Sequence, residues 1–193
     1  MRYQRQISLA GFGEAKQQLL QNSHVLIVGA GGLGSPAMLY LAGAGVGRIT
    51  IVDDDVVSLS NLHRQVVHTT AHVGEQKVRS AAEALQSLNP SITVHDVAER
   101  LNWDNALRLM ADVDVVIDGS DNFATRHIVS AACARAGIPH VWASVLGFDA
   151  QLSVFWAGKG PVYEDIFPEP PAPGSIPNCA QAGVLGPLVG IIG

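Results

Sequence analysis

Cysteine and charged residues are both scarce in this chain of 193 residues. The two cysteines, Cys133 and Cys179, form no Cys-x-x-Cys pair. So few thiols exclude a disulfide-stabilised scaffold and are typical of a reducing compartment, so we expect a cytoplasmic protein. Charged residues make up 15% of the chain and hydrophobic residues 48%, which excludes an intrinsically disordered protein.

Long apolar runs are absent as well. The most apolar stretch, GVLGPLVGIIG at 183–193, has about half of the roughly 20 residues that a membrane-spanning helix needs. The N-terminal MRYQRQISLA contains no apolar segment typical of a signal peptide. The net charge is −5, so the basic excess of a dedicated nucleic-acid binder is missing too. We therefore expect neither a membrane nor a nucleic acid as partner.

Short apolar segments alternate with segments of helical period over the first 156 residues. Such alternation predicts an α/β domain, and we expect a Rossmann-like, doubly wound, mostly parallel sheet with flanking helices. The expected strands are residues 25–28, 48–52, 92–97, 113–118, 140–145 and 151–156, and the expected helices are 15–20, 35–44, 75–88, 103–110 and 124–136.

The composition changes after residue 156. Six of the ten prolines lie within 157–178, which predicts a long irregular loop. The glycines of 183–193 resemble the start of a tightly packed element. We therefore divide the chain into a core at 1–156 and, at 157–193, a loop with the start of a C-terminal element, and we expect the natural protein to continue beyond it.

A glycine-rich turn follows the first expected strand. Gly29, Gly31 and Gly34 match G-x-G-x-x-G, in which the glycines allow a tight turn, a close approach to phosphate and close packing of helix on strand. Asp53 ends the next strand, where a carboxylate can accept hydrogen bonds from ribose hydroxyls. These features predict a nucleotide site. On this motif alone, an oxidoreductase that binds NAD(P) is the first alternative.

Two cations and an acid indicate a more highly charged ligand. Arg64 and Lys77 follow the strand that ends at Asp53, whereas the pyrophosphate of a dinucleotide is largely satisfied by the glycine turn and the helix N-terminus. Extra cations therefore favour ATP. Asp121 follows the strand at 113–118 and can hold Mg²⁺, with capping of the next helix as its alternative role.

Together these segments resemble the MoeB/ThiF family, the prokaryotic relatives of ubiquitin-activating enzymes. The resemblance extends over essentially the whole chain, and the combination of SNLHRQ with GAGGLG is far more specific than either motif alone. The matching segments are RYQRQI at 2–7, the run from GAGGLG to SNLHRQ at 29–65, GEQK at 74–77, DGSDNFATR at 118–126 and CAQAGVLGPLVGIIG at 179–193.

The resemblance implies an adenylyltransferase. Such enzymes use ATP and Mg²⁺ to adenylate the C-terminal glycine carboxylate of a small ubiquitin-fold sulfur carrier that ends in Gly-Gly, and they release pyrophosphate. Residues 1–156 would form the ATP-binding adenylation core of a homodimer. By position in the motifs, Asp53 would bind the ribose and Asp121 the Mg²⁺. The phosphates would be bound by Asn61, Arg64 and Lys77, and Arg5 would reach the partner's ATP. The nucleotide site would be completed by Gly29, Gly31, Gly32, Gly34, Asp55, Gln65 and Asn122.

The chain departs from the family pattern at the zinc-binding cysteines, and the role of Cys179 stays open. Many members hold a structural zinc ion with two Cys-x-x-Cys pairs, but Val162 and Asp165 stand where the first pair would be, so we expect no zinc. In the thiamine branch a cysteine in the segment of Cys179 can link to the carrier through sulfur. For Cys179 a simple loop cysteine is the alternative, whereas Cys133 lies in an apolar helix and is expected in the core.

Two alternatives stay open beside the oxidoreductase. A tRNA threonylcarbamoyladenosine dehydratase shares the fold and also adenylates a carboxylate, but it usually needs a basic surface, which the net charge of −5 disfavours. A binding module without enzymatic activity is the other. Thiamine, molybdopterin and other sulfur-transfer pathways use similar activators, so the sequence leaves the identity of the carrier open.

Overall fold

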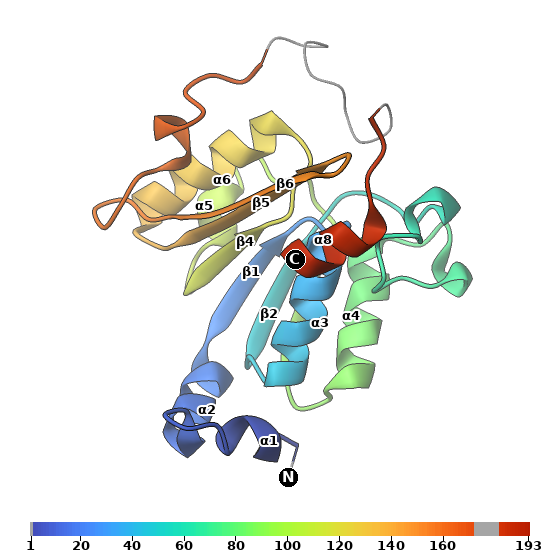
Figure 1. Cartoon of the computed structure of the whole chain (residues 1–193), viewed down its shortest axis with the longest axis vertical. Helices are drawn as coiled ribbons and strands as arrows, with labels where there is room; N and C mark the ends of the chain where they lie inside the picture. The colour runs from blue at the N-terminus through green and yellow to red at the C-terminus, as the bar shows by residue number, and fades with distance from the viewer. Residues whose placement is uncertain (1, 172–181) are drawn as a thin grey trace.

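The chain folds around one six-stranded sheet, seen in the computed structural model of Figure 1, which describes residues 2–171 and 182–193. The strand order is β3-β2-β1-β4-β5-β6. Every pairing is parallel except that of β5 with β6. This order confirms the doubly wound, mostly parallel sheet. The strands are β1 His24–Val28, β2 Arg48–Val52, β3 Thr93–Val97, β4 Val115–Asp118, β5 His140–Leu146 and β6 Asp149–Phe155.

Two apolar layers enclose the sheet, one on each face. Val25 and Ile27 of β1 belong to the core cluster on the side of α3 and α4, whereas Leu26 and Val28 belong to the cluster on the side of α5 and α6. Alternate side chains of a strand point to opposite faces, so a run that is buried throughout needs cover on both. The covering helices are α3 Gly34–Ala44, α4 Lys77–Leu88, α5 Ala106–Leu109 and α6 Phe123–Ala136.

The remaining helices lie at one end of the molecule and across the sheet. α1 (Gln4–Ile7) and α2 (Gly13–Asn22) lie at one end of the molecule, and α8 (Gly186–Ile192) lies across the front of the sheet near α3 (Figure 1). The connections contain the short turns η1 (Leu59–Asn61), η2 (Thr70–His72) and η3 (Tyr163–Asp165). Within the described ranges, no helix is long and apolar enough to cross a membrane.

Helix α4 begins two residues later than the sequence predicts. Glu75 and Gln76 belong to the loop instead, because the Val57 N–H donates to the Glu75 carbonyl over 2.8 Å and Val56 forms a bridge with Gln76. Lys77 is thereby the first helical residue. The spacing of apolar side chains could not reveal where α4 begins, because loop residues that continue the helical spacing cannot be told from helical residues in the sequence.

The segment after β6 adds to the core. Tyr163 is fully buried and packs edge-on against Phe155 and Trp142, with ring centroids 5.7 and 5.4 Å apart. At the two positions where the family pattern has cysteines, the Val162 N–H donates to the Asp165 carboxylate over 2.8 Å. Residues 161–167 are therefore anchored to the sheet by aromatic packing and a hydrogen-bonded turn.

The turn between β1 and α3 depends on close backbone contacts. Gly29 has φ +94, and a Cβ there would lie 3.0 Å from the carbonyl oxygen of Gly119, in the loop after β4. A Cβ at Gly34 would overlap the Gly29 carbonyl oxygen more closely than real Cβ contacts allow. Glycine at these positions lets the loops after β1 and β4 lie against each other.

One buried histidine fixes the same turn from the other side. His68 is 5% exposed, its Nε2 donates to the Ala30 carbonyl over 2.9 Å, and its Nδ1 accepts from the Ser80 hydroxyl of α4 over 2.9 Å. Burial lowers the pKa of His68 below its usual value of 6.5, because the charged ring would lose its hydration. The neutral imidazole therefore links the turn to α4.

We expect Gly34→Ala to destabilise the fold by at least the 1–3 kcal/mol or so typical of overpacking, because the new methyl group meets backbone that cannot move independently. Gly43→Ala in the same helix is the matched control, since nothing lies within 4 Å of its Cβ position. This control should stabilise the helix by about 0.5–1 kcal/mol. Urea unfolding of both variants measures the difference, and equal stability would contradict the close contact.

The free energy of unfolding should fall as the pH is lowered below about 6.5. The unfolded chain binds a proton at His68 near that pH, whereas the folded chain binds it only at lower pH, so stability is full above this range and lost on acidification. His68→Gln should be less stable at pH 7.5 and should lose less stability between pH 7.5 and 5.5. An unchanged pH dependence in His68→Gln would contradict the role of His68.

Candidate functional site

A cleft of about 350 Å³ opens where the carboxyl ends of β1, β2 and β4 meet the loops that follow them. In doubly wound sheets ligands bind at this place, where the chain turns from one half of the sheet to the other. The cleft brings together most of the residues predicted from the sequence. Among its lining residues are Gly29, Gly31, Gly32, Asp53, Asp55, Arg64, Gln65, Lys77, Asp121 and Asn122.

Asp53 joins the glycine turn to the end of β2. One carboxylate oxygen accepts the Ala30 N–H over 2.8 Å, and the other accepts the Asp55 N–H over 2.8 Å. Burial raises the pKa of Asp53, and the nearby charge of Lys77 opposes this rise. Each oxygen keeps a free lone pair, so the carboxylate can still accept a bond from a ligand hydroxyl.

Lys77 is a buried cation on the wall of the cleft. Only 7% of its side chain is exposed, and its Nζ forms an ion pair with the Asp55 carboxylate over 2.8 Å. The Asp55 side chain is 69% exposed. A buried ammonium group is stable only when it is paired, and an exposed carboxylate is an easily replaced partner. A ligand phosphate could therefore take the place of Asp55.

Arg64 lies beside the glycine turn. Its Cγ would be 3.4 Å from a Cβ at Gly32. Its Nη1 donates to His63 Nε2 over 2.8 Å, and no carboxylate in the described ranges lies within ion-pair distance of its guanidinium. The charge of Arg64 therefore remains free to interact with an anion at the turn.

Gln65 follows with a buried side chain that has unused hydrogen-bonding capacity. It is 4% exposed, its Nε2 lies near Gly31, and its Oε1 is buried without a hydrogen-bond partner. A buried amide oxygen without a donor is unfavourable by about 1–3 kcal/mol, so a donor from a ligand or from water fits this position.

The sequence left two roles open for Asp121, binding of Mg²⁺ and capping of the next helix, and in the structure its neighbour provides the cap. Asn122 caps α6 by accepting the Thr125 N–H over 2.9 Å. The Asp121 side chain is exposed in the cleft and makes no hydrogen bond or ion pair with any described residue. A free carboxylate is a hard oxygen ligand of the kind that Mg²⁺ prefers, so the donor chemistry of Asp121 fits this ion.

Three predicted residues do not line the cleft. Asn61 ends η1, where its carbonyl accepts the N–H groups of Arg64 and Gln65, so it shapes the loop that carries Arg64. Gly34 acts in packing. Arg5 is exposed on α1, at the end of the molecule that carries the N-terminus (Figure 1). Cys179 lies outside the described residues.

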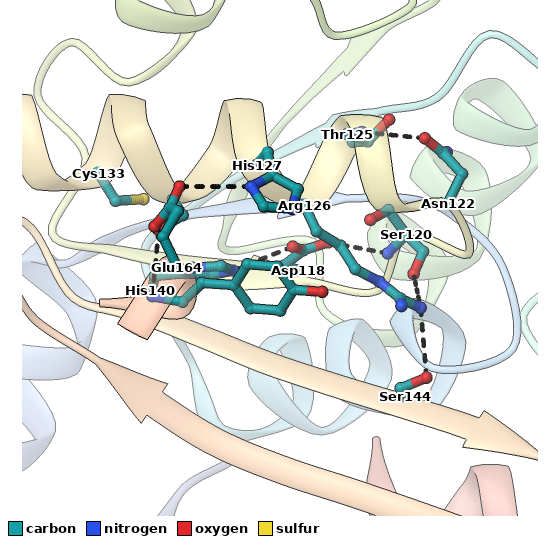
Figure 2. A network of polar contacts seen from close by, with 12 residues as sticks. Asp118, Ser120, Asn122, Thr125, Arg126, His127, Cys133, His140, Ser144 and Glu164 are labelled. Carbon is teal, nitrogen blue, oxygen red and sulfur yellow. Dashed lines mark hydrogen bonds and ion pairs between the residues drawn. The ribbon is translucent and has the colours of Figure 1, made fainter. Parts of the chain in front are cut away.

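Several lining residues were not identified from the sequence. Arg126, on α6, is 6% exposed and its Nη2 donates to the Ser120 carbonyl over 3.2 Å and to Ser144 Oγ over 3.3 Å (Figure 2). A cation near the N-terminus of a helix is unfavourable because it opposes the helix dipole, and this unusual position could have identified Arg126 from the sequence. Glu99 and Arg100 follow the end of β3, so the rule that ligands bind beyond strand ends could have identified them.

Comparison with known proteins gives relatives of high identity. The chain is 49% identical over 189 residues to the probable adenylyltransferase/sulfurtransferase MoeZ of Mycobacterium tuberculosis, which covers 96% of this chain and 48% of MoeZ. It is 45% identical over 197 residues to the sulfur carrier protein adenylyltransferase of Thermus thermophilus, covering 100% of this chain and 73% of the relative. The chain thus spans about half the length of MoeZ.

Solved structures with the same fold include two from E. coli. A structure of MccB with AMPCPP and MccA superimposes with a TM-score of 0.83 at 25% identity, over 99% of this chain and 59% of MccB. The tRNA N6-threonylcarbamoyladenosine dehydratase TcdA superimposes with a TM-score of 0.69 at 34% identity, over 72% of this chain and 57% of TcdA.

The family model of ThiF matches residues 3–193. This match includes the glycine turn, the loop that carries Arg64 and Lys77, and the last helix. It also disfavours the oxidoreductase alternative, which rested on the glycine turn and Asp53 alone. The chain belongs to the ThiF family.

Proposed function

We propose that this chain adenylates the C-terminal glycine carboxylate of a small ubiquitin-fold sulfur carrier, with ATP as the second substrate and pyrophosphate as product. The observation that carries the proposal is the presence of Arg64, Lys77 and the glycine turn in one cleft. The names of the relatives, adenylyltransferase/sulfurtransferase and sulfur carrier protein adenylyltransferase, support the same reaction. The thiamine and molybdopterin pathways are both compatible with it.

The reaction needs no general base. A terminal carboxyl group has a pKa near 3.5 and is ionised at neutral pH. One of its oxygens forms a bond to the α-phosphorus of ATP while the bond from that phosphorus to the oxygen bridging to the β-phosphate breaks. The bonding electrons leave with pyrophosphate, and an acyl adenylate remains.

The barrier is mainly electrostatic, because a carboxylate must approach a triphosphate. Two like charges 4 Å apart repel each other by about 4 kcal/mol at an effective dielectric constant near 20. A fixed cation at a similar distance offsets a repulsion of that size. Arg64 and Lys77 supply two such cations beside the turn, so positioning and charge stabilisation would provide the catalysis.

Magnesium belongs to the same proposal. Asp121 would hold the ion, which supplies further positive charge to the phosphates when it is bound. The remaining residues keep their own roles: the turn between Gly29 and Gly34 offers backbone N–H groups, and Asp53 accepts ribose hydroxyls. A zinc ion is not part of the proposal.

A tRNA N6-threonylcarbamoyladenosine dehydratase is the second candidate, because TcdA has the same fold at 34% identity. Both candidates adenylate a carboxylate. Identity to the sulfur-carrier relatives is higher, and they cover essentially all of this chain. ATP–pyrophosphate exchange with a panel of Gly-Gly-ended carriers and, separately, with the modified tRNA distinguishes the two. Exchange with the tRNA alone would replace the main proposal.

Lys77→Ala and Arg64→Ala should each lower carrier-dependent ATP–pyrophosphate exchange by roughly 10²–10³, as the loss of one fixed donor to a developing anion does. Lys16→Ala, at an exposed position on α2, is the control for loss of a lysine and should exchange at the wild-type rate. Unchanged exchange in both cleft variants would remove the two residues from the mechanism.

The homodimer and the role of Arg5 form a further part of the proposal. Arg5 does not line the cleft of its own chain, as expected for a residue that would serve the partner's site. Arg5→Ala and Asp121→Ala should each be folded and inactive. When the two are mixed and allowed to exchange subunits, about a quarter of the sites would contain both intact residues and activity should return to that extent. Absence of any recovery in verified heterodimers would contradict the cross-dimer role.

A further inference from the structure

Arg126 is a buried cation with no anionic partner among the residues that the structure describes. It is 6% exposed and lines the cleft, yet no carboxylate oxygen in the described part of the chain lies within 4.0 Å of its guanidinium nitrogens. Its hydrogen bonds use Nη2 alone and go to the neutral oxygens of Ser120 and Ser144, while Nε has no acceptor (Figure 2). A buried charge is normally paired, so this arrangement requires another explanation.

Two carboxylates packed near Arg126, those of Asp118 and Glu164, have other partners. Asp118 accepts the Ser120 N–H over 3.0 Å, and its other oxygen lies 3.0 Å from His140 Nε2 (Figure 2). Glu164 accepts a serine hydroxyl over 2.6 Å. Burial raises the pKa of Tyr163, so this phenol stays neutral. The charge of Arg126 opposes the rise at Tyr163, but that phenol carries no charge to balance it, and neither carboxylate forms an ion pair with Arg126.

The surroundings of Arg126 also hold its guanidinium plane in place. The Phe123 ring lies 5.0 Å from the guanidinium carbon and the Trp142 ring 5.6 Å. Aromatic faces stabilise a cation but leave its N–H groups free to donate at the edge of the plane. Arg126 is also the fourth residue of α6, where the positive end of the helix dipole disfavours a cation. The dipole and the side chain therefore both favour an anion at this position.

Arg126 lies on the side of the cleft away from the ribose position. Along the sheet, Asp53 follows β2, the glycine turn follows β1, and Arg126 lies beyond β4 with a bond to Ser144 of β5. A nucleotide with its ribose at Asp53 and its phosphates over the turn leaves this far side for the second substrate. That substrate, under the proposed function, carries a planar anion with two oxygens.

We propose that Arg126 binds the terminal carboxylate of the incoming carrier and places it against the α-phosphate. This inference rests on the proposed function and assigns the acid-binding residue of that site. A guanidinium presents parallel N–H donors that match a carboxylate, whereas an ammonium or amide does not. Binding of the acid satisfies the unused donors of Arg126 and removes the like-charge barrier to the phosphate.

The test compares acid and amide forms of the same ligand. A peptide ending in Gly-Gly, as free acid and as C-terminal amide, is titrated by NMR into the wild-type chain saturated with a non-hydrolysable ATP analogue. We expect the wild type to prefer the acid about 10- to 100-fold, as for a hydrogen bond to a charged group. Arg126→Gln should reduce this preference to near one, Arg126→Lys should restore it in part, and affinity for the ATP analogue should change less than threefold or so.

Arg135→Gln is the matched control, because Arg135 is an exposed arginine in the last turn of the same helix. It should keep the wild-type preference, and thermal unfolding checks that each variant is folded. If Arg126→Gln keeps the acid preference of the wild type, or if the wild type shows none, the role of Arg126 is wrong. This readout does not depend on turnover, so absence of ATP–pyrophosphate exchange with every carrier would overturn the proposed function without deciding the outcome for Arg126.

Discussion

The close approach of two backbone segments at the centre of the sheet determines most of this structure. The loops after β1 and β4 touch where Gly29 meets Gly119, and α3 can begin there only because Gly34 has no side chain. This contact puts the N-terminus of α3 beside the N-terminus of α6, so the positive ends of two helix dipoles face one cleft. An anion site follows from backbone packing before any cationic side chain is considered.

The charged side chains then divide this cleft into two parts. Lys77 is held by an exposed carboxylate that a ligand can displace, whereas Arg126 is held by neutral oxygens and aromatic rings and has no counterion to displace. Under the proposed function, the phosphates of ATP bind together with a metal ion and can replace the carboxylate that pairs with Lys77. A cation kept without a partner suits a single small acid. The two kinds of support match the two substrates of the proposed adenylation reaction, one on each side of the glycine turn.

The sequence predicted the fold well because its signals are local. Glycine spacing, apolar strands and helical period each depend on residues close together in the chain, whereas the strand order is seen only in the structure. The gathering of Asp53, Lys77 and the glycine turn in one cleft was predictable for the same reason, since these residues follow successive strands. Arg126 was missed because its role depends on residues distant in sequence. Only the folded chain reveals that β5 contributes Ser144 and that Asp118 and Glu164 have other partners. The start of α4 was misplaced by two residues because a bridge to Val56 competes with the helix.

The contact between α8 and the glycine turn links two distant parts of the chain. A Cβ at Gly32 would lie 2.8 Å from Val189, so the last helix rests directly on the turn. Val189 is buried, but Ile191 on the same helix is 80% exposed. Under the proposed function, a nucleotide that displaced the turn would therefore also press on Val189, and α8 would carry that movement to the exposed Ile191.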